Sequence, residues 1–283
     1  MKLEDNGILI VNKEKGYTSR DVVNIISKLF GPKKAGHNGT LDPLATGVLV
    51  ICLNRYTKLN NILVADEKEY IAEVTLGIKT DTLDIDGKII EEKEEMIDKS
   101  SLLAAFKRFE TTYEQEVPLY SAVKVNGKKL YEYARSCEDV LLPRKKVTIK
   151  KIELLDFNEN KFSFKCTVSK GTYIRSLIRD ILDDLGVTGT MSNLIRTRQG
   201  IFDIKEAYSL DDIRSGHYKL LKVKDVLNID KVTVSLELKA KILNGNKFKG
   251  NYSDRVLCLD ENGEELAIYK RDNDDMRVEV MLK

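Results

Sequence analysis

The sequence predicts an α+β protein built on a largely antiparallel sheet. Segments 70–77 and 162–168 alternate apolar and polar residues, which is typical of strands with one buried face. Helical spacing of apolar residues appears in only a few places, most clearly over 174–185. Because several such strands follow one another with few helices between them, antiparallel connections are favoured over repeated strand–helix–strand units.

The expected elements can be given in chain order. A short apolar strand is followed by a helix that opens at Thr18 and Ser19, and Gly31 and Pro32 end that helix. An acidic stretch that ends at Asp98 is expected to be an exposed connection. The strands are expected at 7–11, 48–53, 70–77, 121–125 and 162–168, and the helices at 18–30, 101–109 and 174–185.

Composition excludes several classes of protein. The 283 residues are one-third charged, but the net charge is only +2, so binding to a polyanion needs local basic patches. The four cysteines form no CxxC pair, and the two histidines lie far apart, which argues against a disulfide framework and a metal site. With no apolar signal segment and no run of membrane-spanning length, we expect a cytoplasmic protein.

From Lys231 onward the character of the chain changes. Short strands alternate there with turns such as Asn244–Gly245 and Asn262–Gly263. We therefore predict one larger domain over 1–228 and a small, mostly β domain over 229–283.

The segment from Gly36 to Gly47 is the most informative part of the chain. It holds three glycines, a histidine and an Asp42–Pro43 corner, and it leads into a buried strand. A loop anchored in this way can hold a carboxylate rigidly at the floor of a cleft. On turn chemistry alone, an Asp-Pro pair is simply a turn.

Together, several separated segments resemble the TruB family of tRNA pseudouridine synthases. The resemblance spans nearly all of the first 210 residues and is carried by five motifs in one order. They are Gly7–Ser19, Gly36–Gly47, Ser121–Arg135, Lys170–Ser176 and Leu194–Arg196. The chain departs from the family pattern at Glu14, where proline is usual, and at Asn38, where threonine is usual. The last fifty residues resemble a reduced PUA domain, an RNA-binding appendage in this family.

The resemblance implies isomerisation of uridine to pseudouridine at position 55 in the T-loop of tRNA, without cofactor or metal. Asp42 matches the catalytic aspartate, and Arg175 matches its arginine partner. Tyr70 and Tyr173 match two active-site tyrosines, of which Tyr70 stacks on the extruded uracil. Tyr173 and Arg175 both lie off the apolar stripe of the 174–185 helix, so they can face a cleft.

The resemblance also implies contacts with the T-arm of tRNA. His37 matches the residue that fills the space left by the flipped base. Basic residues interleave with tyrosines between Tyr120 and Arg135, as suits phosphate contact and base stacking. The residues assigned to RNA binding are His37, Lys13, Lys124, Lys128, Lys129, Arg135 and Arg196. We expect a monomer, because no exposed apolar helix requires a partner.

Two other functions remain open from the sequence. One is a guide-RNA-dependent pseudouridine synthase that works inside a ribonucleoprotein. The other is a non-catalytic protein that binds tRNA or helps it fold.

Overall fold

The structure, a computed structural model, describes residues 6–31 and 34–283. Its main sheet has nine strands in the order β1-β3-β12-β4-β11-β10-β7, with β2 on β3 and β13 on β12. The pairings of this sheet are antiparallel except between β12 and β3, which confirms the predicted sheet type. The strands are β1 (Gly7–Lys13), β2 (Ala35–Asn38), β3 (Thr46–Leu53), β4 (Glu67–Leu76), β7 (Thr112–Glu116), β10 (Arg144–Asn158), β11 (Lys161–Ser169), β12 (Gly189–Gln199) and β13 (Phe202–Asp203).

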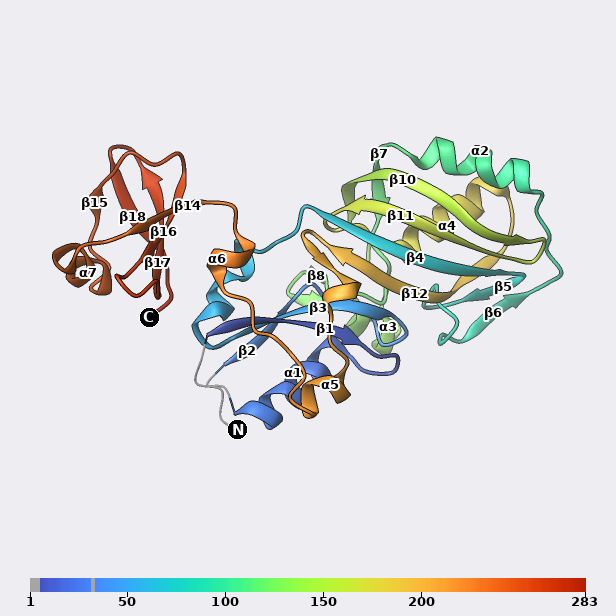
Figure 1. Ribbon diagram of the computed structural model, residues 1–283. Helices are drawn as coiled ribbons and strands as arrows, with labels where there is room; N and C mark the ends of the chain where they lie inside the picture. The colour runs from blue at the N-terminus through green and yellow to red at the C-terminus, as the bar shows by residue number, and fades with distance from the viewer. Residues whose placement is uncertain (1–5, 32–33) are drawn as a thin grey trace.

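Helices cover the two halves of this sheet separately (Figure 1). The helices α1 (Ser19–Phe30) and α5 (Leu210–Arg214) pack on β1 and β3 through an apolar core of their own. The helices α2 (Lys99–Phe109) and α4 (Ile174–Leu185) pack on β4, β10, β11 and β12 through a second core. Leu41, Leu44 and Ala45 belong to that second core, so the loop that carries Asp42 is anchored beneath α4.

Local signals in the sequence set the ends of two helices as expected. At the start of α1, the Thr18 hydroxyl accepts a hydrogen bond from the backbone N–H of Asp21, and the Asp21 carboxylate accepts one from the N–H of Thr18. Gly31 ends α1 at φ 57°, and Gly186 ends α4 at φ 70°. Both glycines adopt the left-handed conformation that closes a helix.

The connections between these elements correct two expectations. The acidic stretch forms a strand that pairs with an earlier one, although it is exposed as predicted. The strand expected at 121–125 covers only 124–125, because the carbonyl oxygens of Ser121 and Val123 accept hydrogen bonds from the N–H groups of Tyr131 and Leu130 instead of joining a strand pair. The elements are β5 (Ile78–Thr80), β6 (Ile89–Glu92), β8 (Lys124–Val125), β9 (Lys128–Lys129), α3 (Leu130–Ser136), α6 (Val223–Val226) and the 3-10 helices η1 (Asn54–Asn61) and η2 (Ile204–Glu206).

The C-terminal residues form a second sheet, which lies to one side of the main sheet (Figure 1). Its order is β14-β16-β17-β18-β15, and it carries a helix, α7 (Leu236–Leu243), that the strand-and-turn pattern did not predict. Leu257 and Ile268 share a buried cluster with Ile8 and Tyr56, so apolar contacts join the two parts. The strands are β14 (Asp230–Thr233), β15 (Phe248–Lys249), β16 (Arg255–Leu259), β17 (Glu265–Asp272) and β18 (Asp275–Met281).

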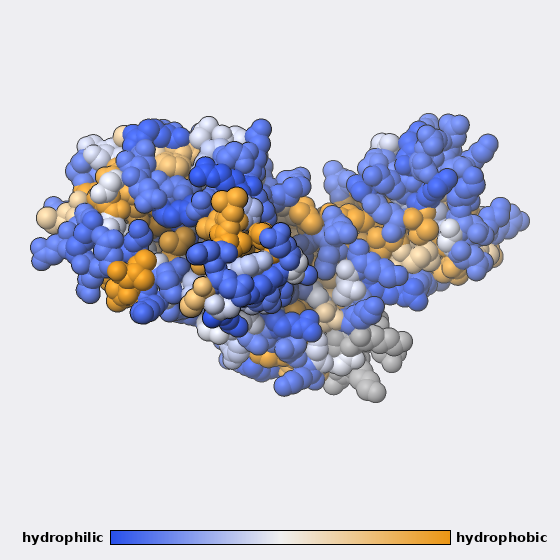
Figure 2. Space-filling model, turned by 180° about the vertical axis from the view of Figure 1, so that it is seen from behind, coloured by the Kyte–Doolittle hydropathy of each residue, from blue (hydrophilic) through white to orange (hydrophobic). Residues whose placement is uncertain are grey.

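The surface seen from behind is mostly hydrophilic, with scattered apolar residues (Figure 2). No helix within 6–31 or 34–283 is long and apolar enough to cross a membrane. Cys52, Cys166 and Cys258 are buried, whereas Cys137 is exposed.

Candidate active site

A cavity of about 270 Å³ opens where the Asp42 loop, β4 and the N-terminus of α4 meet. This volume is close to the lower end for ligand pockets, about 300 Å³. The cavity brings together all four residues predicted to be catalytic, from segments more than one hundred residues apart. Its lining is Thr40, Leu41, Asp42, Lys68, Tyr70, Ser121, Ala122, Gly171, Thr172, Tyr173, Ile174, Arg175 and Leu194.

The backbone of the Asp42 loop is held through its carbonyl groups. Six consecutive carbonyl oxygens, from residue 38 to residue 43, each accept a hydrogen bond. The donors from outside the loop are the side chains of Gln199, Arg196, Ser19 and Lys13 and the N–H of Gly16. Because buried carbonyls need such partners, this arrangement fixes the backbone on which Asp42 sits.

Lys13 and Arg196, which were assigned to RNA binding, lie inside the protein. Both have an exposed fraction of 0%. The ammonium group of Lys13 donates to the carbonyl oxygens of Glu14, Tyr17 and Pro43, at 2.9, 2.6 and 3.3 Å. The Arg196 guanidinium donates to the carbonyls of Val48, Thr40 and Gly39. Their assignment to RNA binding is therefore corrected: both cations position the loop.

Arg175 is the central cation of the site. Its Nη2 atom lies 2.8 Å from Oδ2 of Asp42, and its side chain is only 5% exposed, against 37% for Asp42. On its other side, Nη1 lies 3.7 Å from Oδ2 of Asp84 and donates to the Thr82 carbonyl at 2.8 Å. The buried cation is thus compensated by two carboxylates, and Asp42 keeps an edge open to the cavity.

Asp84 is a positioning residue that the sequence did not single out. It is 8% exposed, it does not line the cavity, and burial raises its pKa. Its Oδ1 atom accepts a hydrogen bond of 2.7 Å from the Thr82 hydroxyl, so the carboxylate is fixed in place. Its closest contact with the catalytic pair is therefore through Arg175.

Replacing Asp84 with asparagine is expected to slow turnover about tenfold with little change in KM. The amide keeps the size of the side chain, but without the charge of Asp84 the Arg175 guanidinium interacts more strongly with Asp42. The expected tenfold loss corresponds to a rise of about 1.4 kcal/mol in the activation free energy. Steady-state kinetics of Asp84→Asn would measure this. The matched control is Asp86→Asn, an exposed aspartate two residues on, which should behave as wild type. A rise in KM alone would contradict the positioning role.

The two predicted tyrosines both line the cavity. Tyr70 is 6% exposed, and burial raises the pKa of its hydroxyl, while the Arg196 guanidinium partly offsets this. Burial also raises the pKa of Tyr173. Both hydroxyls therefore stay protonated near neutral pH and can donate a proton or a hydrogen bond.

A second set of contacts anchors the start of α4, which carries Tyr173 and Arg175. The side-chain oxygen of Gln115 accepts the backbone N–H of Tyr173 at 2.8 Å. The Gln115 amide nitrogen donates to the Tyr113 hydroxyl, which in turn donates to Asp180, both at 2.9 Å. Gln115 is 1% exposed, and these buried contacts tie the first turn of α4 to β7.

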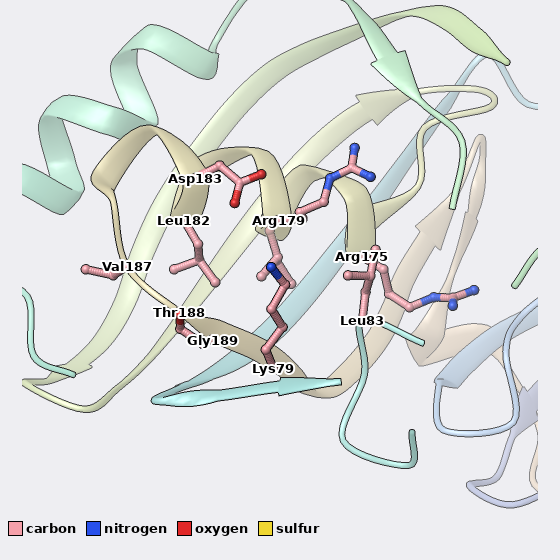
Figure 3. Close-up of a pocket in the computed structure, with 10 residues that line it drawn as sticks. Lys79, Leu83, Arg175, Arg179, Leu182, Asp183, Val187, Thr188 and Gly189 are labelled. Carbon is pink, nitrogen blue, oxygen red and sulfur yellow. The ribbon is translucent and has the colours of Figure 1, made fainter. Parts of the chain in front are cut away.

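A second, much smaller cavity lies beside the first, and Arg175 lines both (Figure 3). It measures about 40 Å³, whereas roughly 10–15 Å³ is enough to hold one water molecule, so it has room for a few waters only. In Figure 3 the guanidinium groups of Arg175 and Arg179 point in different directions, so the two do not converge on one ligand. The larger cavity is therefore the candidate site.

The remaining residues assigned to RNA binding lie outside the cavity lining. Lys124, Lys128 and Lys129 belong to the β8–β9 hairpin, and Arg135 lies on α3 just after it. Lys129 and Arg135 both lie over the ring of Tyr131, while Lys128 lies over Tyr133. Since Ser121 and Ala122 line the cavity, this basic and aromatic segment starts at its rim.

His37 lies on β2, opposite Ile51 of β3. Burial lowers its pKa, and the guanidinium groups of Arg196 and Arg20 lower it further. The imidazole is therefore neutral near pH 7 and suits packing against a base better than pairing with a phosphate.

Within the part of the chain that the structure describes, no group of three or more His, Cys, Asp and Glu residues could hold a metal ion.

Comparison with known proteins defines the class first. The family described as "TruB family pseudouridylate synthase (N terminal domain)" matches residues 27–174, which contain the Asp42 loop, β4 and Tyr173. The protein is thus a pseudouridine synthase.

Relatives narrow this further. The chain is 43% identical over 279 residues to tRNA pseudouridine synthase B of Caldanaerobacter subterraneus subsp. tengcongensis, covering 96% of this chain and 97% of the relative. It is 40% identical over 279 residues to the protein of that name from Fusobacterium nucleatum, covering 95% and 97%. The chain belongs to the TruB family.

The fold is shared with a solved Cbf5–Nop10–Gar1 complex. The similarity has a TM-score of 0.72 and 26% identity, and it covers 98% of this chain and 85% of the other. A structure of an H/ACA RNP bound to a substrate RNA containing 2'-deoxyuridine gives a TM-score of 0.71 at 23% identity. At this identity the similarity shows only that the fold is shared.

Proposed function

We propose that this protein isomerises uridine to pseudouridine at position 55 in the T-loop of tRNA, acting as a monomer. Asp42 serves as the catalytic carboxylate and acts on a uridine flipped out of the RNA. The observation that carries the proposal is the Asp42–Arg175 pair, 2.8 Å apart, in a cavity that Tyr70 and Tyr173 also line. The relatives named tRNA pseudouridine synthase B support tRNA as the substrate.

The reaction is an internal rearrangement of one nucleotide. The bond from ribose C1′ to N1 of uracil breaks, the base turns within the cavity, and C1′ bonds to C5. C5 then loses its proton and N1 gains one, so atoms and electrons balance without an oxidant. Asp42 supplies the negative charge that an electron-poor centre needs, and the protonated hydroxyl of Tyr70 is in the cavity for proton transfer.

RNA recognition is proposed for two other surfaces. The β8–β9 hairpin and α3 present Lys124, Lys128, Lys129 and Arg135 to the T-arm, and His37 fills the space left by the flipped base. The domain 229–283 adds a further RNA contact, with exposed Lys241 and Lys249, as a PUA-like domain. Lys239 and Lys247 of this domain are already paired, with Asp260 and Asp275.

The guide-RNA-dependent alternative receives less support. Relatives named tRNA pseudouridine synthase B reach 43% identity, whereas the Cbf5 complex reaches 26%. The non-catalytic alternative is opposed by the intact set of Asp42, Tyr70, Tyr173 and Arg175 around one cavity.

Tritium release from tRNA tests the proposal directly. Transcripts carrying tritium at C5 of uridine should release one equivalent on incubation with the purified protein, because C5 loses its hydrogen only when it becomes the new point of attachment. A transcript with cytidine at position 55 should release none. Release that persists from this control would exclude position 55. Bound tRNA without release from either transcript would favour the guided or the non-catalytic alternative.

A further inference from the structure

Lys68 is a charged residue of the cavity that the proposed chemistry leaves unused. It lies on β4 two residues before Tyr70, so both side chains lie on the same face of the strand and both line the cavity. The glutamates on either side of it point to the opposite face, where Glu67 pairs with Lys150 and Glu69 pairs with Lys165.

Lys68 has no such partner. Throughout residues 6–31 and 34–283, no carboxylate lies within 4.0 Å of its ammonium group, and no hydrogen bond from it is formed. Burial, together with the nearby Arg196 guanidinium, lowers its pKa to about 8, which leaves it mostly protonated at neutral pH. A partly buried cation that faces an open cavity without an anion is suited to receive one from a ligand.

The charges around the cavity also favour an anion. Among the residues that line the cavity, Lys68 and Arg175 are cations and Asp42 is the one carboxylate. Arg175 already forms ion pairs with Asp42 and Asp84. Lys13 and Arg196 already donate hydrogen bonds to backbone carbonyl oxygens. The uncompensated charge therefore falls on Lys68. A carbonyl oxygen of uracil is neutral and would not balance this charge, whereas a phosphate would.

We propose that Lys68 binds a phosphate group of the RNA backbone next to the flipped uridine. This inference rests on the proposed function, since it requires an RNA strand whose uridine enters the cavity. Lys68 thus holds the backbone at the cavity and adds affinity for the RNA, while the placing of the base is left to the residues around Asp42 and Tyr70. It contributes to binding the RNA before the reaction and equally during it.

The test is the salt dependence of RNA binding by the full chain. The probe is a T-arm stem-loop RNA with pseudouridine already at the target position, so that no reaction occurs during the measurement. For Lys68→Met we expect affinity about tenfold weaker near 0.1 M salt, and a slope of log K against log salt that is smaller by about 1. The single-turnover rate at saturating enzyme should stay within a few-fold of wild type. Lys68→Arg should restore both affinity and slope.

The matched control is Lys161→Met, at the far end of β11, where the lysine is paired with Glu73 at 2.9 Å. This variant should keep the wild-type slope. An unchanged slope in Lys68→Met overturns the inference, and a slower single-turnover rate with unchanged affinity would assign Lys68 to charge on the uracil instead. Should circular dichroism show Lys68→Met unfolded, Lys68→Gln takes its place. If the wild type itself binds no T-arm RNA, it is the proposed function that fails.

Discussion

Tritium release by Asp42→Asn is expected to fall by about 10³-fold or more, while tRNA binding persists. Asparagine has the shape of aspartate, and its oxygen can still accept a hydrogen bond from Arg175, which lies 2.8 Å away in the wild type. It carries no negative charge, however, and cannot act as a nucleophile or balance a cationic sugar. The loop backbone should not move, because its anchors are carbonyl groups that the substitution leaves in place.

Two measurements on this variant separate chemistry from binding. Tritium release from tRNA labelled at C5 reports the reaction, and filter binding with the same tRNA reports affinity. Release at the wild-type rate would remove Asp42 from the mechanism. Loss of tRNA binding together with release would show that Asp42 is needed to bind the RNA as well as to react with it.

Arg175→Met is expected to lower the free energy of unfolding by about 3 kcal/mol and to abolish activity. Methionine fills the space but leaves the carboxylates of Asp42 and Asp84 without their shared cation. Breaking a buried pair by removing one partner costs about 3–5 kcal/mol. The carbonyls of Thr82 and Tyr120 lose their donor as well. Urea unfolding of the variant at pH 7 would measure the loss.

The pH dependence of this loss identifies its origin. Burial already raises the pKa of Asp84, and Arg175 opposes that rise. Without Arg175 the folded-state pKa of Asp84 rises further above its unfolded value, so the folded state binds the proton more tightly. The stability gap to wild type should therefore narrow as the pH falls from 7 to 5. A gap that stays constant with pH would point to lost packing instead.

Two further variants serve as controls for Arg175→Met. Arg179→Met removes the arginine one turn later, whose side chain is 20% exposed and pairs with Glu116 and Asp180, and it should cost less than about 1 kcal/mol. Adding Asp84→Asn to Arg175→Met should recover part of the lost stability, because the buried charge without a partner is then gone.

The sequence predicted the elements that depend only on neighbouring residues, such as alternating apolar positions and helix caps. The alternating strands, the capped helix α1 and the helix α4 needed only nearby residues. The order of the strands could not be predicted, because β12 lies between β3 and β4 through pairings that join distant segments. The helix α7 was missed because its eight residues lie among short strands and turns.

Some residues of the candidate site could be predicted from the sequence, and others could not. The resemblance indicated Asp42, Tyr70, Tyr173 and Arg175, and the structure brings all four to one cavity. The spacing of Lys68 and Tyr70 on an alternating strand was a usable signal, since residues two apart share a face. Asp84 and Gln115 had no such signal, because their contacts with Arg175 and Tyr173 arise only when the chain has folded.

The anchoring of the Asp42 loop through carbonyl groups makes part of its shape independent of its exposed side chains. Every amino acid carries a backbone carbonyl, so a substitution such as asparagine for threonine at position 38 leaves the contact with Gln199 available. The side chains of Leu41, Leu44 and Ala45 anchor the loop from within. From outside, Lys13, Ser19, Arg196 and Gln199 hold its carbonyl groups. For enzyme engineering, these four positions form the frame to keep constant, while the exposed side chains of the loop are open to redesign toward other nucleotides.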